Sequence, residues 1–176
     1  VICNSMEDLL FSEFLIFGVT GSGKTEIYLQ LIEKALNAEK SSILLVPEIS
    51  LTPQTVNRFI ARFGKDKIAV LHSKLSVGER YDQWHKINDG KARIIIGARS
   101  AIFAPVKNLG IIIIDEEHDS SYKSEMSPRY NAKEVARYIA KQENIPLVLG
   151  SATPDLETFY RAKNDDIVLL ELKKRA

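Results

Sequence analysis

An eight-residue run near the N-terminus has the residue types and the spacing of a phosphate-binding loop. The run is a glycine, four residues and then Gly-Lys-Thr, made up of Gly18, Val19, Thr20, Gly21, Ser22, Gly23, Lys24 and Thr25. Glycines let backbone amides approach a polyphosphate where a side chain would obstruct them. In this pattern the lysine, Lys24, reaches the β- and γ-phosphates, and the Thr25 hydroxyl ligates Mg²⁺. The run therefore predicts a site for a nucleoside triphosphate and magnesium.

The segments on either side of this run are those that such a loop requires. Apolar residues 14–17 precede it and are typical of a buried strand, whereas residues 26–38 follow it with an amphipathic helical pattern. A phosphate loop works between a strand and a helix, because the positive N-terminal end of the helix then faces the anion. The sequence context thus supports the nucleotide site.

A second group of candidate residues is acidic and follows the most apolar segment, residues 111–114. Asp115 is expected to hold magnesium directly or through water, and Glu116 to act as the general base on the attacking water. Glu117 and His118 are expected to link the nucleotide site to neighbouring elements. The alternative for all four is a solvated acidic loop after a strand.

Small hydroxyl residues follow another apolar segment, residues 147–149. Ser151 and Thr153 are placed to hydrogen-bond the 115–118 segment and to respond to the γ-phosphate. The alternative is an ordinary turn in which a hydroxyl caps the next helix.

Three further segments at the ends of strands offer hydroxyls, amides and cations without catalytic groups. They are residues 47–52, 72–74 and 97–105, and their candidate residues are Ser50, Lys74, Arg99 and Ser100. Such groups suit phosphodiester contacts, although each segment alone could be an ordinary loop.

Strand-like and helix-like segments alternate along the chain. Strands are expected at 14–17, 43–46, 68–71, 93–97, 111–114, 147–149 and 167–170. Helices are expected at 26–38, 51–63, from a cap at Ser76 to about 88, at 132–142 and from Pro154. Continuous rather than alternating apolar strands favour an α/β fold, with a mostly parallel sheet covered by helices on both faces.

The composition is that of an ordinary globular domain. The chain has 176 residues, 45% of them hydrophobic and 27% charged, which suits one domain with a sizeable core. One cysteine excludes an internal disulfide framework and an all-cysteine metal site. No apolar run is long enough to span a membrane and no signal peptide is recognisable, so a cytoplasmic location is expected. The net charge of +1 does not decide whether nucleic acid is bound.

The two ends of the chain are less regular than its middle. Residues 1–13 carry only a weak helical pattern and are expected to be the stub of an upstream segment, whereas residues 14–176 form the nucleotide-binding domain. Both ends suggest a piece of a longer protein.

The motifs in their order resemble the first motor lobe of superfamily 2 helicases. The phrases are GVTGSGKT, PEISLT, GARSAIFAP, DEEH and GSATP, and their combination is similar to that of the bacterial primosomal replication-restart DNA helicases. The resemblance covers about residues 14–176. It implies a RecA-like lobe of an ATP-dependent 3′-to-5′ DNA helicase that acts on single-stranded and forked DNA, together with other primosome proteins.

The resemblance also implies roles for individual residues. Lys24 and Glu116 would be catalytic, Thr25 and Asp115 would hold Mg²⁺, and Glu117, His118, Ser151 and Thr153 would couple hydrolysis to movement. Ser50, Lys74, Arg99 and Ser100 would contact DNA. Tyr122 and Tyr130 fall where the family has an aromatic-rich loop that senses DNA, although here the loop has no tryptophan. A packing role is the alternative for both tyrosines.

Several parts that the resemblance implies are not found in this sequence. They are a second motor lobe with its arginine finger, an N-terminal fork-binding domain and a cysteine-rich zinc module. We therefore expect weak nucleotide binding and poor hydrolysis from these residues alone. The alternatives are the motor lobe of another superfamily 2 DNA translocase and a nucleotide-gated binding module. A phosphate-loop kinase is disfavoured, because no acceptor-binding lid is apparent.

Overall fold

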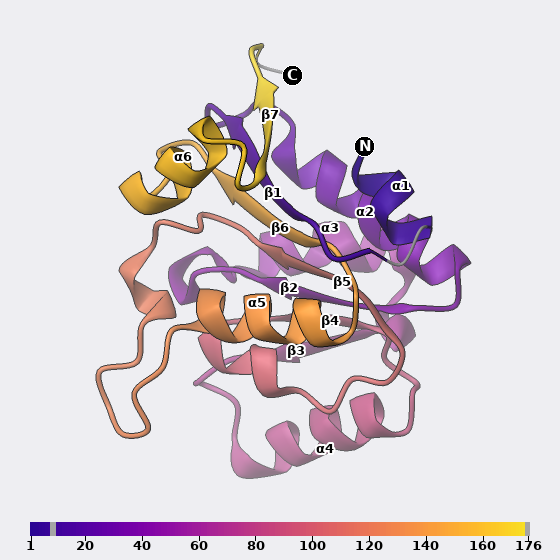
Figure 1. Ribbon diagram of the computed structural model, residues 1–176. Helices are drawn as coiled ribbons and strands as arrows, with labels where there is room; N and C mark the ends of the chain where they lie inside the picture. The colour runs from indigo at the N-terminus through magenta and orange to yellow at the C-terminus, as the bar shows by residue number, and fades with distance from the viewer. Residues whose placement is uncertain (8–9, 175–176) are drawn as a thin grey trace.

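Parallel apolar strands form the centre of the molecule. The computed structural model describes residues 1–7 and 10–174, and within them seven strands form one sheet in the order β3-β4-β2-β5-β6-β1-β7 (Figure 1). The strands are β1 (Glu13–Gly18), β2 (Ser41–Leu45), β3 (Ile68–Leu71), β4 (Ile94–Gly97), β5 (Leu109–Ile114), β6 (Leu147–Ser151) and β7 (Val168–Leu172). Each pair of neighbouring strands is parallel. The predicted α/β fold with a parallel sheet is confirmed.

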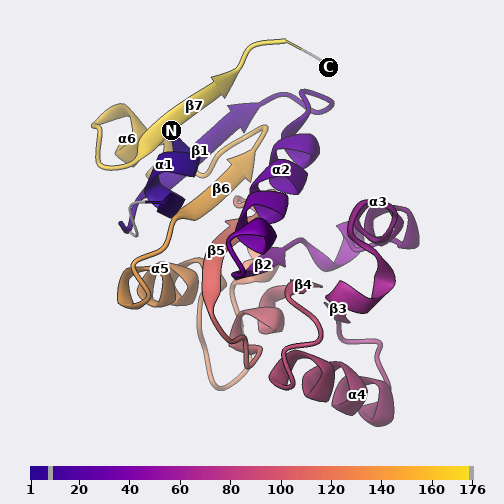
Figure 2. The ribbon, with the colours of Figure 1, turned by 90° about the vertical axis from the view of Figure 1, so that its right-hand side faces the viewer.

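Helices cover both faces of this sheet. Figures 1 and 2 show α2 and α3 on one side of it and α5 and α6 on the other. The α-helices are α1 (Ile2–Glu7), α2 (Lys24–Asn37), α3 (Pro53–Phe63), α4 (Val77–Asn88), α5 (Ala132–Gln142) and α6 (Leu156–Lys163). Short 3₁₀ turns are η1 (Glu48–Ser50), η2 (Lys65–Lys67), η3 (Arg99–Phe103) and η4 (Ser120–Tyr122).

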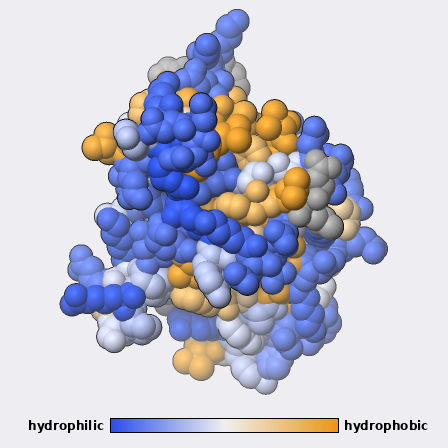
Figure 3. All heavy atoms as spheres, in the orientation of Figure 1, coloured by the Kyte–Doolittle hydropathy of each residue, from blue (hydrophilic) through white to orange (hydrophobic). Residues whose placement is uncertain are grey.

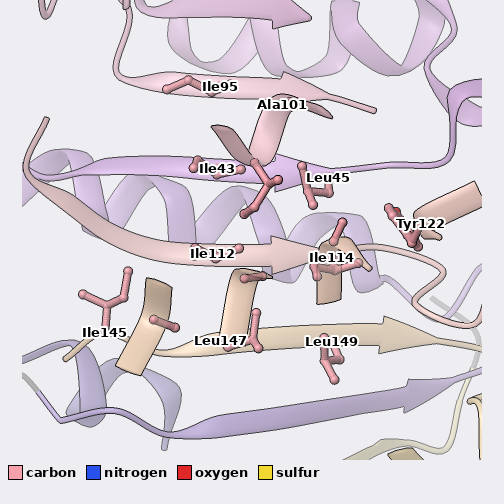
Figure 4. Packing of buried hydrophobic residues seen from close by; sticks show 14 of the residues in the cluster. Ile43, Leu45, Ile95, Ala101, Ile112, Ile114, Tyr122, Ile145, Leu147 and Leu149 are labelled. Carbon is pink, nitrogen blue, oxygen red and sulfur yellow. The ribbon is translucent and has the colours of Figure 1, made fainter. Parts of the chain in front are cut away.

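The core is divided by the sheet into two apolar clusters. Successive residues of a strand point to opposite faces, so Ile112 and Ile114 pack toward α5, whereas Ile111 and Ile113 pack toward α2. Figure 4 shows the first cluster, in which side chains of β2, β5 and β6 lie side by side. Burial on both faces explains why these strands are continuously apolar, since each such side chain contributes about 1.5–3 kcal/mol.

Helix α1 packs on the rest of the chain. Ile2 and Met6 are buried in the same cluster as the apolar face of α2, and Glu7 forms a 2.8 Å ion pair with Lys34. The division proposed from the sequence at residue 13 stays a prediction. In the structure, residues on both sides of that position share one apolar cluster.

Helix starts agree with the sequence to within about two residues. Ser76 caps α4 as predicted, and its hydroxyl and the Glu79 carboxylate form a reciprocal capping box. Helix α3 begins at Pro53 rather than Leu51, because the Thr52 side chain accepts the Thr55 amide and so acts as the cap. The last helix begins at Leu156, two residues after Pro154.

The face of the molecule seen in the orientation of Figure 1 is mostly polar. On the face shown in Figure 3, hydrophilic residues predominate and hydrophobic residues form separate patches. Scattered apolar side chains of this kind are normal on folded proteins. Among the helices that the structure describes, none is long and apolar enough to cross a membrane.

Candidate functional site

The phosphate-loop residues form a tight turn between β1 and α2, as the sequence predicts. Gly21 and Gly23 have φ angles of 80° and 88°, in the left-handed region that favours glycine. The Lys24 side chain is buried, and its ammonium donates a 2.8 Å hydrogen bond to the Gly18 carbonyl. The loop thus presents backbone amides, a helix N-terminus and a cation at one place, which is the chemistry of polyphosphate binding.

The acidic residues that follow β5 lie at the same edge of the sheet. Only β6 separates β5 from β1, and parallel strands end at a common edge (Figure 2). The Lys24 ammonium lies 3.9 Å from a Glu116 carboxylate oxygen. Both residue groups line one cleft of about 790 Å³, which is formed by Thr20, Gly21, Ser22, Gly23, Lys24, Thr25, Glu26, Leu29, Arg58, Ala61, Arg62, Asp115 and Glu116.

Asp115 is held at both its side chain and its backbone. The Tyr28 hydroxyl donates a 2.9 Å hydrogen bond to Asp115 Oδ1, and the Tyr122 hydroxyl donates a 2.7 Å bond to the Asp115 carbonyl oxygen. Burial raises the pKa of the Asp115 carboxyl, since it disfavours the charged form, and the nearby Glu116 carboxylate adds to this effect. A cation near this carboxylate would lower its pKa again.

Glu116 has an unusual backbone conformation. Its φ of 43° lies in the left-handed region, which residues other than glycine seldom adopt. Such conformations cost about 1–3 kcal/mol and cluster at functional sites. The turn places the Glu116 side chain in the nucleotide cleft.

Glu117 points away from the cleft into the protein. Its side chain is 0% exposed and accepts hydrogen bonds from Lys133 Nζ at 2.8 Å and from Thr158 Oγ1 at 3.0 Å. Its other oxygen accepts the Asp155 backbone amide at 2.7 Å. Burial lowers the pKa of Lys133, but the bonds to Glu117 and Asp155 outweigh this and leave the pKa raised. Glu117 therefore joins the end of β5 to α5 and α6.

His118 connects the acidic segment to the end of β6. Its Nδ1 lies 2.8 Å from Ser151 Oγ, and its Nε2 lies 3.3 Å from Thr153 Oγ1. Glu116 Oε2 lies 3.7 Å from the same Nδ1. The structure thus brings together His118, Ser151 and Thr153, three of the four residues that the sequence predicts as coupling residues, and places Glu116, the predicted general base, beside them.

A smaller cleft of about 200 Å³ contains part of the predicted DNA contacts. Arg99 and Ser100 line it together with Glu48, Ser73, Ala98 and Ser121. Ser50 lies at the end of η1 and Lys74 follows β3, and neither lines this cleft. The Ser73 hydroxyl donates to the Glu48 carboxylate, so a negative charge also lies there.

Arg99 fixes the loop that follows the acidic segment. Its guanidinium donates hydrogen bonds to the Ser121 and Lys123 carbonyl oxygens at 3.2 and 2.6 Å, and it lies 5.5 Å from the centre of the Tyr130 ring. The Tyr130 ring also packs edge-on against Phe103, with centroids 5.0 Å apart. Tyr130 is half-buried, so its predicted DNA contact stays a prediction.

The predicted DNA contact of Tyr122 is wrong in this structure. The residue is 1% exposed, and its hydroxyl is bonded to the Asp115 carbonyl oxygen. A buried ring cannot stack on a nucleotide base. The Tyr122 ring packs in the apolar cluster beneath the acidic segment (Figure 4). This is the alternative role that the sequence left open.

Sequence reasoning missed Tyr28, which is buried and bonds to Asp115, and two arginines that line the nucleotide cleft. Tyr28 was missed although it lies four residues after Lys24, a spacing that places it on the same face of α2. Arg58 and Arg62 line the cleft from α3, also four residues apart. Their contribution depends on how α3 packs beside α2, which their local sequence does not specify.

The residues present fit a magnesium ion that is bound together with a nucleotide. Among residues 1–7 and 10–174 no cluster of three or more His, Cys, Asp or Glu side chains could hold a metal alone. Mg²⁺ at nucleotide sites typically takes only one or two protein ligands, the rest being phosphate oxygens and water. Thr25 and Asp115 line the same cleft and supply that number of oxygen ligands.

The chain is similar to known helicase proteins. The DEAD/DEAH box helicase family matches residues 4–162. The replication restart protein PriA of Bacillus subtilis (strain 168) is 63% identical over 162 residues, which cover 92% of this chain and 20% of that protein. The PriA of Chlamydia pneumoniae is 52% identical over 176 residues, which cover 99% of this chain and 23% of that protein. This chain therefore spans about a fifth to a quarter of the length of these relatives.

A solved structure shares the fold. The structure of RecG bound to a three-way DNA junction superposes with a TM-score of 0.65 and 22% sequence identity, covering 96% of this chain and 23% of that one. At this identity the likeness concerns the fold alone, and it agrees with the RecA-like lobe expected from the motifs.

Proposed function

This chain belongs to the DEAD/DEAH box helicase family, and from that premise we propose that it is the first motor lobe of an ATP-dependent 3′-to-5′ DNA helicase. Its biological role in this proposal is to restart replication at stalled forks. The observation that carries the proposal is the meeting of Lys24, Asp115 and Glu116 in one cleft at the edge of the sheet. The PriA relatives, named as replication restart proteins, support the biological role.

Each residue of the cleft has a distinct part in the proposed hydrolysis of ATP. The loop amides and Lys24 bind the phosphates and hold the γ-phosphate in place. Glu116 takes a proton from a water molecule whose oxygen bonds to the γ-phosphorus, while the bond from that phosphorus to the β,γ-bridging oxygen breaks. Thr25 and Asp115 would hold Mg²⁺, which when bound neutralises charge on the phosphates.

The contacts around His118 provide a path from hydrolysis to movement in this proposal. Glu116 lies in the nucleotide cleft, and His118 connects it to Ser151 and Thr153 at the end of β6. Glu117 ties the same segment to α5 and α6. A change of Glu116 on loss of the γ-phosphate would therefore displace elements on the other face of the sheet.

DNA is the proposed substrate of the motor. Ser50, Lys74, Arg99 and Ser100 offer hydroxyls and cations that suit phosphate contacts without base readout. The structure of RecG bound to a three-way DNA junction supports DNA as the partner of a lobe with this fold. Other primosome proteins would be further partners, and the reaction would take place in the cytoplasm.

The test is DNA-stimulated ATP hydrolysis by the full-length protein on forked DNA. We expect Glu116→Gln to lower kcat about 100-fold or more, because it removes the general base, while nucleotide binding is retained. Glu143→Gln, at an exposed glutamate that caps the end of α5, is the control. More than a tenth of the wild-type rate in Glu116→Gln would contradict the assignment. Intact in-cell function of an inactive variant would favour a nucleotide-gated binding module instead.

A further inference from the structure

The buried side chain of Tyr28 lies against Asp115, one of the acidic residues of the nucleotide cleft. Tyr28 belongs to α2, one helical turn after Lys24, and its side chain is 1% exposed. Its hydroxyl donates a 2.9 Å hydrogen bond to Asp115 Oδ1 across 87 residues of sequence. Tyrosine is not needed here to fill apolar space alone, because phenylalanine would pack in the same way without a hydroxyl.

Strand β6, which lies between β1 and β5, leaves room for the Tyr28 hydroxyl. A Cβ atom at Gly150 of β6 would lie 1.7 Å from the Tyr28 oxygen and 2.9 Å from its ring carbon Cζ. Gly150 does not have a left-handed φ, so its backbone conformation alone does not require glycine. The absence of a side chain at Gly150 is thus matched to the presence of the Tyr28 hydroxyl.

The hydroxyl of a second tyrosine, Tyr122, fixes the backbone of Asp115. Tyr122 donates to the Asp115 carbonyl oxygen at 2.7 Å, and the Asp115 amide donates to the Leu45 carbonyl at 2.9 Å. The main chain at Asp115 is therefore held independently of Tyr28. What Tyr28 adds is control over the carboxylate itself.

We propose that Tyr28 is a positioning residue that orients the Asp115 carboxylate for metal binding, in a space that Gly150 keeps open. This inference rests on the proposed function, in which Asp115 holds Mg²⁺. The Tyr28 hydroxyl takes one of the roughly four lone-pair directions of the carboxylate and leaves the others for a metal or its water. Partners of this kind orient metal ligands, and their loss typically lowers metal affinity 10–100-fold.

The test measures metal binding rather than turnover. Mn²⁺ would be titrated by electron paramagnetic resonance into full-length protein saturated with a non-hydrolysable ATP analogue, and analogue binding would also be measured without metal. Tyr28→Phe, which keeps the ring, is expected to weaken Mn²⁺ binding about 10-fold. Metal-free affinity for the analogue should change less than about two-fold, since Lys24 and the loop amides bind the phosphates.

Two matched variants separate positioning from packing. Tyr122→Phe removes a hydrogen bond to the same residue but leaves the carboxylate bound to Tyr28, so Mn²⁺ affinity should fall clearly less than in Tyr28→Phe. Gly150→Ala should displace the Tyr28 hydroxyl and weaken Mn²⁺ binding in an otherwise wild-type chain. Combined with Tyr28→Phe it should add less than its separate effect, because both changes break one interaction.

The possible outcomes separate the positioning role of Tyr28 from the proposed function on which it rests. Mn²⁺ affinity of Tyr28→Phe within about two-fold of wild type would overturn the positioning role while leaving the proposed function intact. Equal losses in Tyr28→Phe and Tyr122→Phe would also overturn it, because they would indicate a general loosening. A wild-type protein without any metal-dependent nucleotide binding would overturn both.

Discussion

At the scale of single residues, Glu117 depends most strongly on its neighbours, because it is a fully buried carboxylate. Glu117 has no exposure to solvent, and its charge is matched by Lys133 and by hydrogen bonds from Thr158 and the Asp155 amide. Burying a charge is tolerated only when partners satisfy it. The same partners hold α5 and α6 against the acidic segment, so both the stability of this region and the proposed coupling depend on one side chain.

Removing the positive charge of Lys133 should destabilise the protein more than removing that of an exposed lysine. Lys133→Met leaves Glu117 without its charged partner, and we expect it to lower the free energy of unfolding by about 3–5 kcal/mol. Urea denaturation followed by circular dichroism measures this. Lys141→Met, at an exposed position of the same helix, is the control and should cost less than about 1 kcal/mol. Similar midpoints for both variants would show that the buried pair contributes little.

The sequence was sufficient to place the candidate residues whose positions depend on local spacing. The phosphate loop and the Asp115–Glu116 pair follow strands directly, and parallel strands must end at one edge. It was insufficient for the tyrosines, because their roles depend on which distant group each hydroxyl meets. Tyr122 was assigned to DNA although it is buried, and Tyr28 was overlooked although it binds Asp115.

At the scale of elements, a second buried carboxylate joins the same two helices at the other edge of the sheet. Glu13 begins β1 and accepts hydrogen bonds of 2.8–3.1 Å from Arg137 of α5 and Arg161 of α6. Burial by itself raises the pKa of Glu13, but the two arginines outweigh it and lower the pKa below its usual 4.5. Helices α5 and α6 are thus tied to the sheet at both edges.

The lowered pKa predicts how stability responds to acid. Because folding favours the ionised form, the contribution of Glu13 is present above about pH 4.5 and is lost as the pH falls through its lower folded value. Glu13→Gln should therefore cost about 2 kcal/mol at pH 7 and flatten the fall of Tm in acid. Thermal unfolding between about pH 7 and pH 3 measures both effects. Parallel Tm curves for wild type and variant would contradict the assignment, and Glu143→Gln serves as the reference.

Element boundaries were predictable where a local signal marks them. Ser76 and Glu79 identify the start of α4, and the apolar runs identify all seven strands within the described residues. Helix α1 was given only a weak pattern. Its stability comes from Ile2 and Met6 packing on α2, and tertiary packing of this kind is not visible in a short local pattern.

At the scale of the whole molecule, nucleotide binding and turnover place different demands on the lobe. The cleft has walls from the phosphate loop, the end of β5 and α3, so its binding groups come from this chain. The helicases that this sequence resembles supply an arginine finger from a second lobe. Such a residue contributes about three to five orders of magnitude to kcat.

The 176-residue chain alone should therefore bind ATP but hydrolyse it slowly. We expect its DNA-stimulated kcat to be at least about 1,000-fold below that of the full-length protein. A phosphate-release assay with and without forked DNA measures the difference, with Glu116→Gln in the same chain as the background. Robust DNA-stimulated turnover by the 176 residues would show that the lobe carries its own full set of catalytic groups.

In the proposed function, this cleft binds ATP with magnesium through Lys24. The most direct measurement is titration of a fluorescent ATP analogue into the 176-residue chain with and without Mg²⁺, using Lys24→Ala as the variant and Lys141→Ala as the control. A guanine analogue tests the choice of base. The account predicts saturable, magnesium-dependent binding that Lys24→Ala abolishes and Lys141→Ala retains. Equal binding by Lys24→Ala and wild type, or no wild-type binding at nucleotide concentrations on the order of 1 mM, would contradict it.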